Sequence, residues 1–180
     1  MFVQTEITPN PNTLKFLPGK IVSEVGPVEF IDKEKTNNEL VRNILSITGV
    51  NMVFLGTDFI TVKKNEELIW NDLKHIIISL INDYYIEGKK SVLNKIEQTD
   101  EDIPQDEVVK KINEILDTKI RPAVARDGGD IKFKSFKDGL VKVELRGSCS
   151  GCPSSMMTLK QGVQNLLCHY IPEVKNVEAL

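Results

Sequence analysis

Gly147-Ser-Cys149-Ser-Gly-Cys152-Pro153-Ser-Ser155 is the stretch of this sequence around which the rest can be organised. It lies between an alternating run that predicts a strand (residues 140–145) and a periodic run that predicts a helix (residues 156–170). Proline is favoured at the first helical position, so Pro153 marks the start of that helix. We therefore expect both sulfurs near the positive end of a helix dipole, which favours thiolate over thiol. The stretch is either a ligand-binding loop or a redox loop.

The residues around this stretch predict a small α+β unit over residues 107–180. The expected elements are a helix over 108–120 that Pro122 interrupts, a turn at Asp127-Gly-Gly-Asp130, strands over 131–136 and 140–145, the final helix, and an edge strand over 174–179. Asp138-Gly139 is a strong two-residue hairpin turn between the two strands. We expect the paired glycines at 128 and 129 to be structural, with Asp127 and Asp130 acting as caps as readily as ligand contacts.

The first half of the chain, residues 1–88, predicts a second α+β unit. The expected elements are strands over 2–8, 14–17 and 28–31, a helix over 36–47, a hairpin pairing 50–55 with 59–63, and a long helix over 69–84 that ends near Gly88. Thr36-Asn-Asn-Glu39 has the spacing of a capping box and is expected to open the shorter helix. The apolar stripes of both helices indicate that they cover an antiparallel sheet.

Residues 89–106 differ in character from both flanking regions. They begin with Lys89-Lys90, continue through Gln98-Thr-Asp-Glu-Asp102, and show weak periodicity. We interpret this stretch as a charged linker. The predicted organisation is a domain over 1–88, a linker over 89–106 and a domain over 107–180. Each domain is expected to be a small α+β unit, an antiparallel sheet with helices packed on it.

The composition excludes several classes of function. Hydrophobic residues make up 41% of the chain and charged residues 27%, as in a globular protein, and the net charge of −3 argues against a general nucleic-acid binder. No apolar run approaches the roughly 20 residues that a membrane span needs. The sequence has no Ser/His/Asp arrangement, phosphate-binding loop or dinucleotide fingerprint, so we expect that the protein is not an enzyme.

The number of available ligands limits what the cysteine pair can hold. Cys149 and Cys152 supply two thiolates, whereas a structural zinc site or a cubane iron–sulfur cluster takes four ligands. His75 is expected in the other domain, and His169 at the far end of the final helix, roughly 25 Å from the loop at 1.5 Å per residue. We therefore expect two chains, related by a two-fold axis, to combine their cysteine pairs into one site of four thiolates.

Two alternatives remain open from spacing alone. Thioredoxin-like motifs also place C-x-x-C between a strand and a helix N-terminus, so Cys149 and Cys152 could form a dithiol/disulfide couple. Zinc and iron–sulfur clusters both accept a set of four thiolates, so the spacing does not distinguish them. The third cysteine, Cys168, is expected on the opposite side of the final helix from its apolar stripe. We interpret it as a spare thiol on a surface or contact face.

Motifs in both halves of the chain together carry a family resemblance. Those of the C-terminal half are Arg121-Pro122-x-Val124-x-x-Asp127-Gly-Gly-Asp130-Ile131, Gly147-x-Cys149-x-x-Cys152-Pro153-Ser154-Ser155 and Ile171-Pro172-Glu173-Val174. Those of the N-terminal half are Phe2-x-Gln4-Thr-Glu6, Thr8-Pro-Asn-Pro-Asn-Thr-Leu-Lys-Phe16, Gly49-Val50 and Asp58-Phe-Ile-Thr-Val62. They resemble the C-terminal and N-terminal domains of the Nfu family of NifU-type iron–sulfur scaffold proteins. The resemblance covers nearly the whole chain and leaves out only the region 89–106.

The resemblance implies a function for the cysteine pair. It implies a [4Fe–4S] cluster bound by Cys149 and Cys152 from two protomers, and delivery of that cluster to apo-proteins after its receipt from upstream assembly machinery. The expected partners are a second copy of the chain and these proteins, with no nucleic acid and no membrane. Mitochondrial members of the family carry a presequence, and Met1 to Glu6 do not resemble one. We therefore expect a bacterial cytoplasmic protein, or a mitochondrial matrix protein in its mature form.

Overall fold

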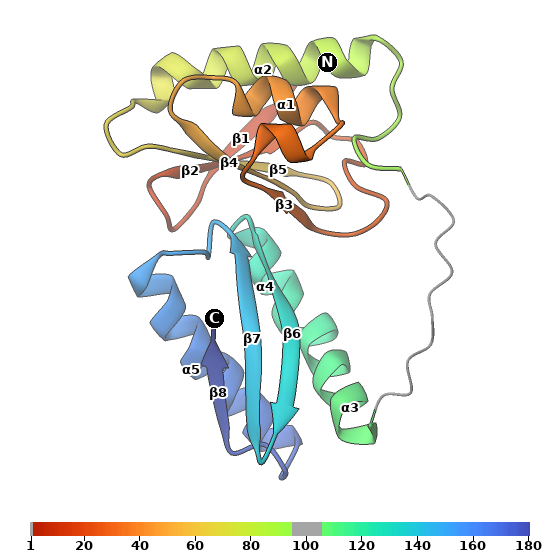
Figure 1. The fold of residues 1–180 in the computed structure, drawn as a ribbon, viewed down its shortest axis with the longest axis vertical. Helices are drawn as coiled ribbons and strands as arrows, with labels where there is room; N and C mark the ends of the chain where they lie inside the picture. The colour runs from red at the N-terminus through yellow and green to blue at the C-terminus, as the bar shows by residue number, and fades with distance from the viewer. Residues whose placement is uncertain (1, 95–105) are drawn as a thin grey trace. The chain divides into compact units, whose positions relative to one another are not determined.

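The computed structural model describes residues 2–94 and 106–180, except for the side chains of residues 154 and 155. The chain divides into two compact units, Met1–Glu97 and Gln98–Leu180 (Figure 1). Each unit has a β-sheet and its own helices, which confirms the α+β class with two units.

The N-terminal unit is a five-stranded antiparallel sheet with two α-helices on one of its faces (Figure 1). Its strands are β1 (Gln4–Ile7), β2 (Thr13–Leu17), β3 (Val28–Phe30), β4 (Val50–Leu55) and β5 (Ile60–Lys64), in the spatial order β1-β2-β5-β4-β3. The helices are α1 (Glu39–Leu45) and α2 (Trp70–Ile86), with a short 3₁₀ turn at Lys33–Lys35.

The hydrophobic core of this unit lies between the sheet and the two helices. Apolar residues alternate with polar ones along the strands and recur with helical periodicity along α1 and α2, so each element turns an apolar face toward this core. Phe16 on β2, Val53 on β4 and Ile77 on α2 are fully buried in this core. Burying side chains of this size stabilises a fold by roughly 1.5–3 kcal/mol each. The predicted strands and helices of this unit therefore form, with boundaries shifted by a few residues.

The capping box predicted at Thr36 and Glu39 is wrong, because α1 starts later and is capped by Asn38. The Asn38 side-chain oxygen accepts a hydrogen bond from the Val41 N–H (3.1 Å), as an N-cap does. The Thr36 hydroxyl instead accepts from the Asn38 N–H (3.2 Å). The Asn38 amide also donates to the Val92 carbonyl (2.7 Å), a tertiary contact that sequence spacing does not show.

The N-terminal unit continues past residue 88, where the linker was expected to begin. Val92 is buried in the core of this unit, and its N–H donates to the Val22 carbonyl (2.8 Å). Ser23 and Leu93 form an isolated parallel bridge. Residues 89–94 are thus part of the fold, because the apolar pair Val92-Leu93 follows the charged Lys89-Lys90 and packs inward. Residues 95–105, the rest of the expected linker, lie outside the described residues.

The C-terminal unit consists of a three-stranded sheet and three α-helices (Figure 1). Its elements are α3 (Glu107–Ile115), a π-helical turn (Leu116–Ile120), α4 (Arg121–Arg126), β6 (Gly129–Lys137), β7 (Leu140–Gly147), α5 (Pro153–Tyr170) and β8 (Asn176–Ala179). β6 and β7 form the predicted hairpin around Asp138 and Gly139, which both have the positive φ of its turn. β8 is an edge strand, as predicted, but it pairs with β7 in parallel, so this sheet is mixed where an antiparallel one was expected.

The expected interruption near Pro122 takes the form of a single π-helical turn. The Arg121 N–H donates to the Leu116 carbonyl, five residues earlier, so the register changes just before the proline. Pro122 then lies in the first turn of α4, where its missing N–H costs no intrahelical bond. The hydrophobic core of this unit includes Ile131 of β6 and Leu167 of α5.

Within the two described ranges, no helix is long and apolar enough to cross a membrane.

Candidate functional site

The cysteine loop, residues 147–152, connects β7 to α5. Gly147 and Gly151 adopt positive φ (69° and 73°), a conformation that suits glycine. The Ser150 N–H donates to the Gly147 carbonyl (3.1 Å), which closes a tight turn. Cys152 is the N-cap residue of α5 and Pro153 its first helical residue. The strand, loop and helix predicted around the two cysteines are therefore confirmed.

Cys149 packs against Gly129, the second glycine of the Asp127–Asp130 turn. Cys149 is 4% exposed and belongs to the core of the C-terminal unit. A Cβ atom built on Gly129 would lie 2.8 Å from the Cys149 Sγ and 2.6 Å from the Arg146 carbonyl oxygen. Those distances are shorter than van der Waals contact, so the sulfur occupies space that exists only because residue 129 has no side chain.

Ser148 ties the cysteine loop to the same turn. It is buried, its hydroxyl donates to the Asp127 carbonyl, and its N–H donates to the Gly128 carbonyl (3.2 Å). The structural role predicted for the two glycines is consistent with this arrangement, since the turn supports the loop. Sequence reasoning did not show that Gly129 and Ser148 join this turn to the cysteine loop. Each residue lies in a short motif next to a predicted β-strand, which is the one feature of the sequence that marks it. The spacing of residues does not show that the Asp127–Asp130 turn and the cysteine loop are in contact.

Burial of Cys149 reverses the thiolate preference expected from the helix dipole. Desolvation raises the pKa of the Cys149 thiol to about 11, and the hydrogen bond with Ser148 offsets only part of that rise. The charges of Asp127, Cys152 and Asp130 raise the pKa further. Cys149 also lies in the loop before Pro153, outside the first turn of α5, where the dipole acts. The Cys149 thiol is therefore protonated at neutral pH.

Asp130 forms a buried ion pair beside the cysteine loop. Its carboxylate is 3.3 Å from the Arg121 Nε, which also donates to the Ile131 carbonyl (3.0 Å). Burial raises the pKa of Asp130, while the Arg121 charge opposes that shift. Arg121 also pairs with Asp117 (2.8 Å), so one guanidinium joins the π-helical turn to the start of β6. This pair fixes the strand on which Gly129 lies.

The other candidate ligands do not join the cysteine pair. Cys168 is half-buried and packs against the C-terminal core, so the expectation that it lies on the side of α5 opposite the apolar stripe is wrong. His169 lies in the last turn of α5 and its ring contacts Tyr170, while His75 belongs to α2 of the other unit. Across residues 2–94 and 106–180, no three His, Cys, Asp or Glu side chains converge in a way that could hold a metal ion.

Comparison with known families identifies both units. The NifU-like domain matches residues 112–178, and the Nfu/NifU N-terminal scaffold domain matches residues 3–88. A human protein named "NFU1 iron-sulfur cluster scaffold homolog, mitochondrial" is 49% identical over 99% of this chain and 71% of its own length. The chain belongs to the Nfu family. The resemblance seen in the sequence motifs is confirmed.

Two further proteins are similar to this chain over different shares of its length. The Arabidopsis thaliana protein named "NifU-like protein 4, mitochondrial" is 45% identical over 99% of this chain and 65% of its own length. The solution structure of a NifU-like protein from Saccharomyces cerevisiae has a TM-score of 0.48 and 26% identity, over 53% of this chain and 87% of that one.

The Ser148 hydrogen bond gives a testable property of this Nfu site. Replacing Ser148 with alanine removes a bond worth about 1 kcal/mol, so we expect the cysteine loop of the metal-free protein to open about fivefold more often. Opening is measured as the rate of amide hydrogen exchange in the loop by peptide mass spectrometry, because alkylation of Cys149 would also respond to the loss of the Ser148 hydrogen bond that lowers the pKa of that thiol. Ser150→Ala is the control in the same loop, because Ser150 is held through its backbone N–H. Equal rates in both variants would show that Ser148 does not hold the loop closed.

Proposed function

We propose that this Nfu protein is an iron–sulfur cluster scaffold and carrier. It binds a [4Fe–4S] cluster between two protomers through Cys149 and Cys152 of each, and passes it to apo-proteins. The observation that carries the proposal is the ligand count, since the described part of the chain brings two thiols to the site and no third metal-binding side chain. The relatives named as iron–sulfur cluster scaffolds support the choice of cargo.

A two-fold arrangement of protomers supplies the missing ligands. Two cysteine loops facing each other give four thiolates, the number that a cubane cluster takes. With four thiolates a [4Fe–4S]²⁺ core carries a charge of −2, and the N-terminus of α5 in each protomer offsets part of it. Each helix contributes roughly 0.3–1 kcal/mol when exposed, and up to about 2 kcal/mol when partly buried.

Cluster uptake requires the cysteine loop to change. Cys149 and Cys152 are both buried, at 4% and 8% exposure, so the sulfurs must turn outward to meet a partner. The bond between Ser148 and Asp127 and the close contact with Gly129 resist that opening. Because its pKa is raised, Cys149 releases a proton when it binds iron. Release to a client then proceeds by exchange of one thiolate for another, which is transfer rather than turnover, as expected of a protein that is not an enzyme.

The proposal assigns partners and a compartment. The partners are a second copy of the chain, upstream cluster-assembly proteins and apo iron–sulfur clients. The names of the relatives support a mitochondrial location, for which the matrix was the expected compartment, and give no support to a bacterial cytoplasm, which was the first expectation.

Stoichiometry tests the proposed function. Anaerobic reconstitution with iron and sulfide should convert the protein into a dimer with about four irons and four sulfides per two chains. Light scattering coupled to gel filtration gives the mass, and elemental analysis gives the metal. A monomer that holds four irons would contradict the shared site. Zinc in place of iron in anaerobically purified protein, or a redox-active disulfide with no metal uptake, would contradict the cargo.

A further inference from the structure

The sheet of the C-terminal unit has an outer face, which points away from the helices of that unit and is rich in positive charge. Ile131 on β6, Val143 on β7 and Val177 on β8 point inward, into the core that they share with α3, α4 and α5. Side chains alternate along a strand, so the residues next to them point outward. The outward charged residues are Lys132, Lys134 and Lys137 on β6, Lys142, Glu144 and Arg146 on β7, and Glu178 on β8. We call this set the basic sheet face.

A β-bulge gathers the three lysines of β6 on this face. The register between β6 and β7 shifts between Phe133 and Ser135. Strict alternation would send Phe136 outward and Lys137 inward, whereas the extra residue of a bulge reverses both. Phe136 accordingly packs against the core of the unit, and Lys137 is exposed. The bulge therefore keeps an aromatic ring off the basic sheet face and adds a cation to it.

The two carboxylates of the basic sheet face are already held by its own cations. Glu144 lies 2.9 Å from the Lys134 Nζ and 2.9 Å from the Arg146 Nη2, and the hydrogen bond with Lys134 is the main cause that lowers the pKa of Glu144. Glu178 lies 3.7 Å from the Lys142 Nζ. These internal pairs leave an excess of positive charge, because three cations surround two carboxylates.

Two further lysines of the face have no carboxylate partner. Within the described residues, neither Lys132 nor Lys137 forms an ion pair, and both are exposed. Asp130, at the start of β6, is buried and pairs with Arg121 instead. The basic sheet face thus has five cations against two carboxylates, an excess of three.

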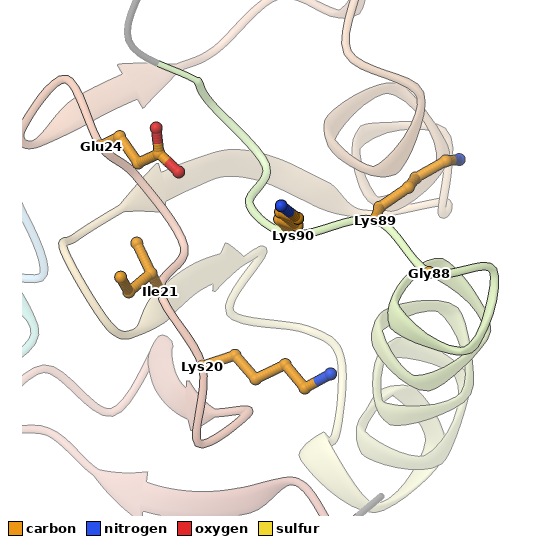
Figure 2. Close-up of a pocket in the computed structure, with 6 residues that line it drawn as sticks. All are labelled: Lys20, Ile21, Glu24, Gly88, Lys89 and Lys90. Atoms are coloured by element: carbon orange, nitrogen blue, oxygen red, sulfur yellow. The ribbon is translucent and has the colours of Figure 1, made fainter.

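A lysine-rich hollow in the N-terminal unit has no such excess. It is lined by Lys20, Ile21, Glu24, Gly88, Lys89 and Lys90 (Figure 2). Glu24 is one of the lining residues, and Glu39 and Glu87 hold Lys89 at 2.9 Å and 2.8 Å. Three carboxylates therefore match three lysines there, and the hollow does not select an anionic partner.

The side chains of the basic sheet face favour an acidic protein over other anionic partners. Its outward residues include no aromatic side chain on which a nucleic-acid base could stack, since Phe133 and Phe136 pack against the core. Glu144 and Glu178 would repel a continuous phosphate backbone, whereas a protein surface carries separate charges and can place a neutral group opposite them. Leu140 is the one apolar side chain among the outward residues, so a bilayer would gain little from contact with the face.

The position of the face favours the partner that receives the cluster. β7 ends at Gly147, where the cysteine loop begins, so Arg146 is the residue next to that loop. Charges more than about 8 Å apart are largely screened at physiological ionic strength, so the local excess acts on a docked surface more than the net charge of −3 of the chain does. The described residues of this unit, 106–180, carry 12 Lys and Arg against 10 Asp and Glu.

We propose that the basic sheet face docks an acidic surface of the apo-protein that receives the cluster. The inference rests on the proposed function and adds the surface that holds a client while its cysteines approach the loop. Carboxylates of the client lie against Lys132 and Lys137, the two cations that have no partner in the free protein. Client docking and cluster ligation are then separable by mutation.

Removal of charge from the full-length, metal-free protein tests the docking surface. The probe is a fluorescein-labelled apo-ferredoxin of acidic sequence, and its binding is followed by fluorescence anisotropy. Replacing Lys132 and Lys137 with glutamine removes two attractions and breaks no ion pair, so we expect about a fivefold loss of affinity. Lys110→Gln with Lys111→Gln is the matched control, because both lysines are exposed on α3, on the helical side of the same unit.

The outcomes separate the docking surface from the scaffold function. Cluster loading, read from visible absorbance after reconstitution, should be equal in the wild type and both double variants. An unchanged affinity in a Lys132/Lys137 variant that loads cluster normally would overturn the docking surface alone, and so would an equal loss in test and control. A wild type that loads no cluster, but depends on Lys132 and Lys137 to bind apo-ferredoxin, would contradict the scaffold function and still support the docking surface.

Two further measurements check the kind of partner and the place of contact. Tighter binding of a DNA duplex or of phosphatidylserine vesicles than of the apo-ferredoxin would overturn the choice of an acidic protein. Amide signals in the NMR spectrum of the wild-type protein should shift along β6 and β7 when apo-ferredoxin is added. Shifts confined to α3 or to the N-terminal unit would overturn the assignment of the face.

Discussion

Replacing either Cys149 or Cys152 with serine is expected to abolish cluster binding. Each substitution removes two of the four thiolates from a shared site, because both protomers carry the change. A serine hydroxyl does not replace a soft thiolate ligand for iron. After anaerobic reconstitution, iron content and visible absorbance should fall by roughly tenfold or more, and the dimer should not form.

Cys168→Ser is the matched control for these variants. Cys168 packs against the core of the C-terminal unit and lies in the last turns of α5, far along the helix from the cysteine loop. We expect it to retain the iron content of the wild type, with at most a small loss of stability. Loss of iron in Cys168→Ser comparable to that in Cys149→Ser would contradict the assignment of ligands, and so would a Cys152→Ser protein that still binds a full cluster.

Gly129→Ala is expected to disturb the closed cysteine loop without replacing a ligand. The new Cβ would lie 2.6 Å from the Arg146 carbonyl oxygen, so the β6–β7 backbone or the Cys149 side chain must move. Overpacking of this kind typically costs about 1–3 kcal/mol. We expect a matching fall in the free energy of unfolding by urea, together with faster cluster loading, because overpacking destabilises the closed cysteine loop that resists uptake.

Gly162→Ala is the control for the glycine substitution. Gly162 lies on α5, and a Cβ there has nothing within 4 Å. Alanine should stabilise this helix by about 0.5–1 kcal/mol and leave cluster loading unchanged. If Gly129→Ala behaved like Gly162→Ala in both unfolding and loading, the contact between Gly129 and Cys149 would have no role in the site.

Local patterns predicted much of the fold and part of the site. Asp138-Gly139 specifies a hairpin turn through backbone conformations that few other residue pairs adopt, and both residues have the positive φ that this turn needs. Pro153 similarly marks the start of α5, since the first helical position needs no N–H. Asn38, by contrast, caps α1 in competition with Thr36, and its additional bond to Val92 joins residues 54 positions apart. No short-range pattern contains that contact.

The sequence by itself determined the family, the two α+β units and the pair of thiols, because motifs, periodicity and ligand counts are properties of neighbouring residues. The tertiary structure alone decided the state of those thiols. Folding packs Cys149 against Gly129 and joins Ser148 to Asp127, two contacts between segments about 20 residues apart. Burial then raises the pKa of Cys149 above the value that a helix dipole alone would give it. Desolvation depends on everything that surrounds the sulfur, and only the folded chain specifies those surroundings.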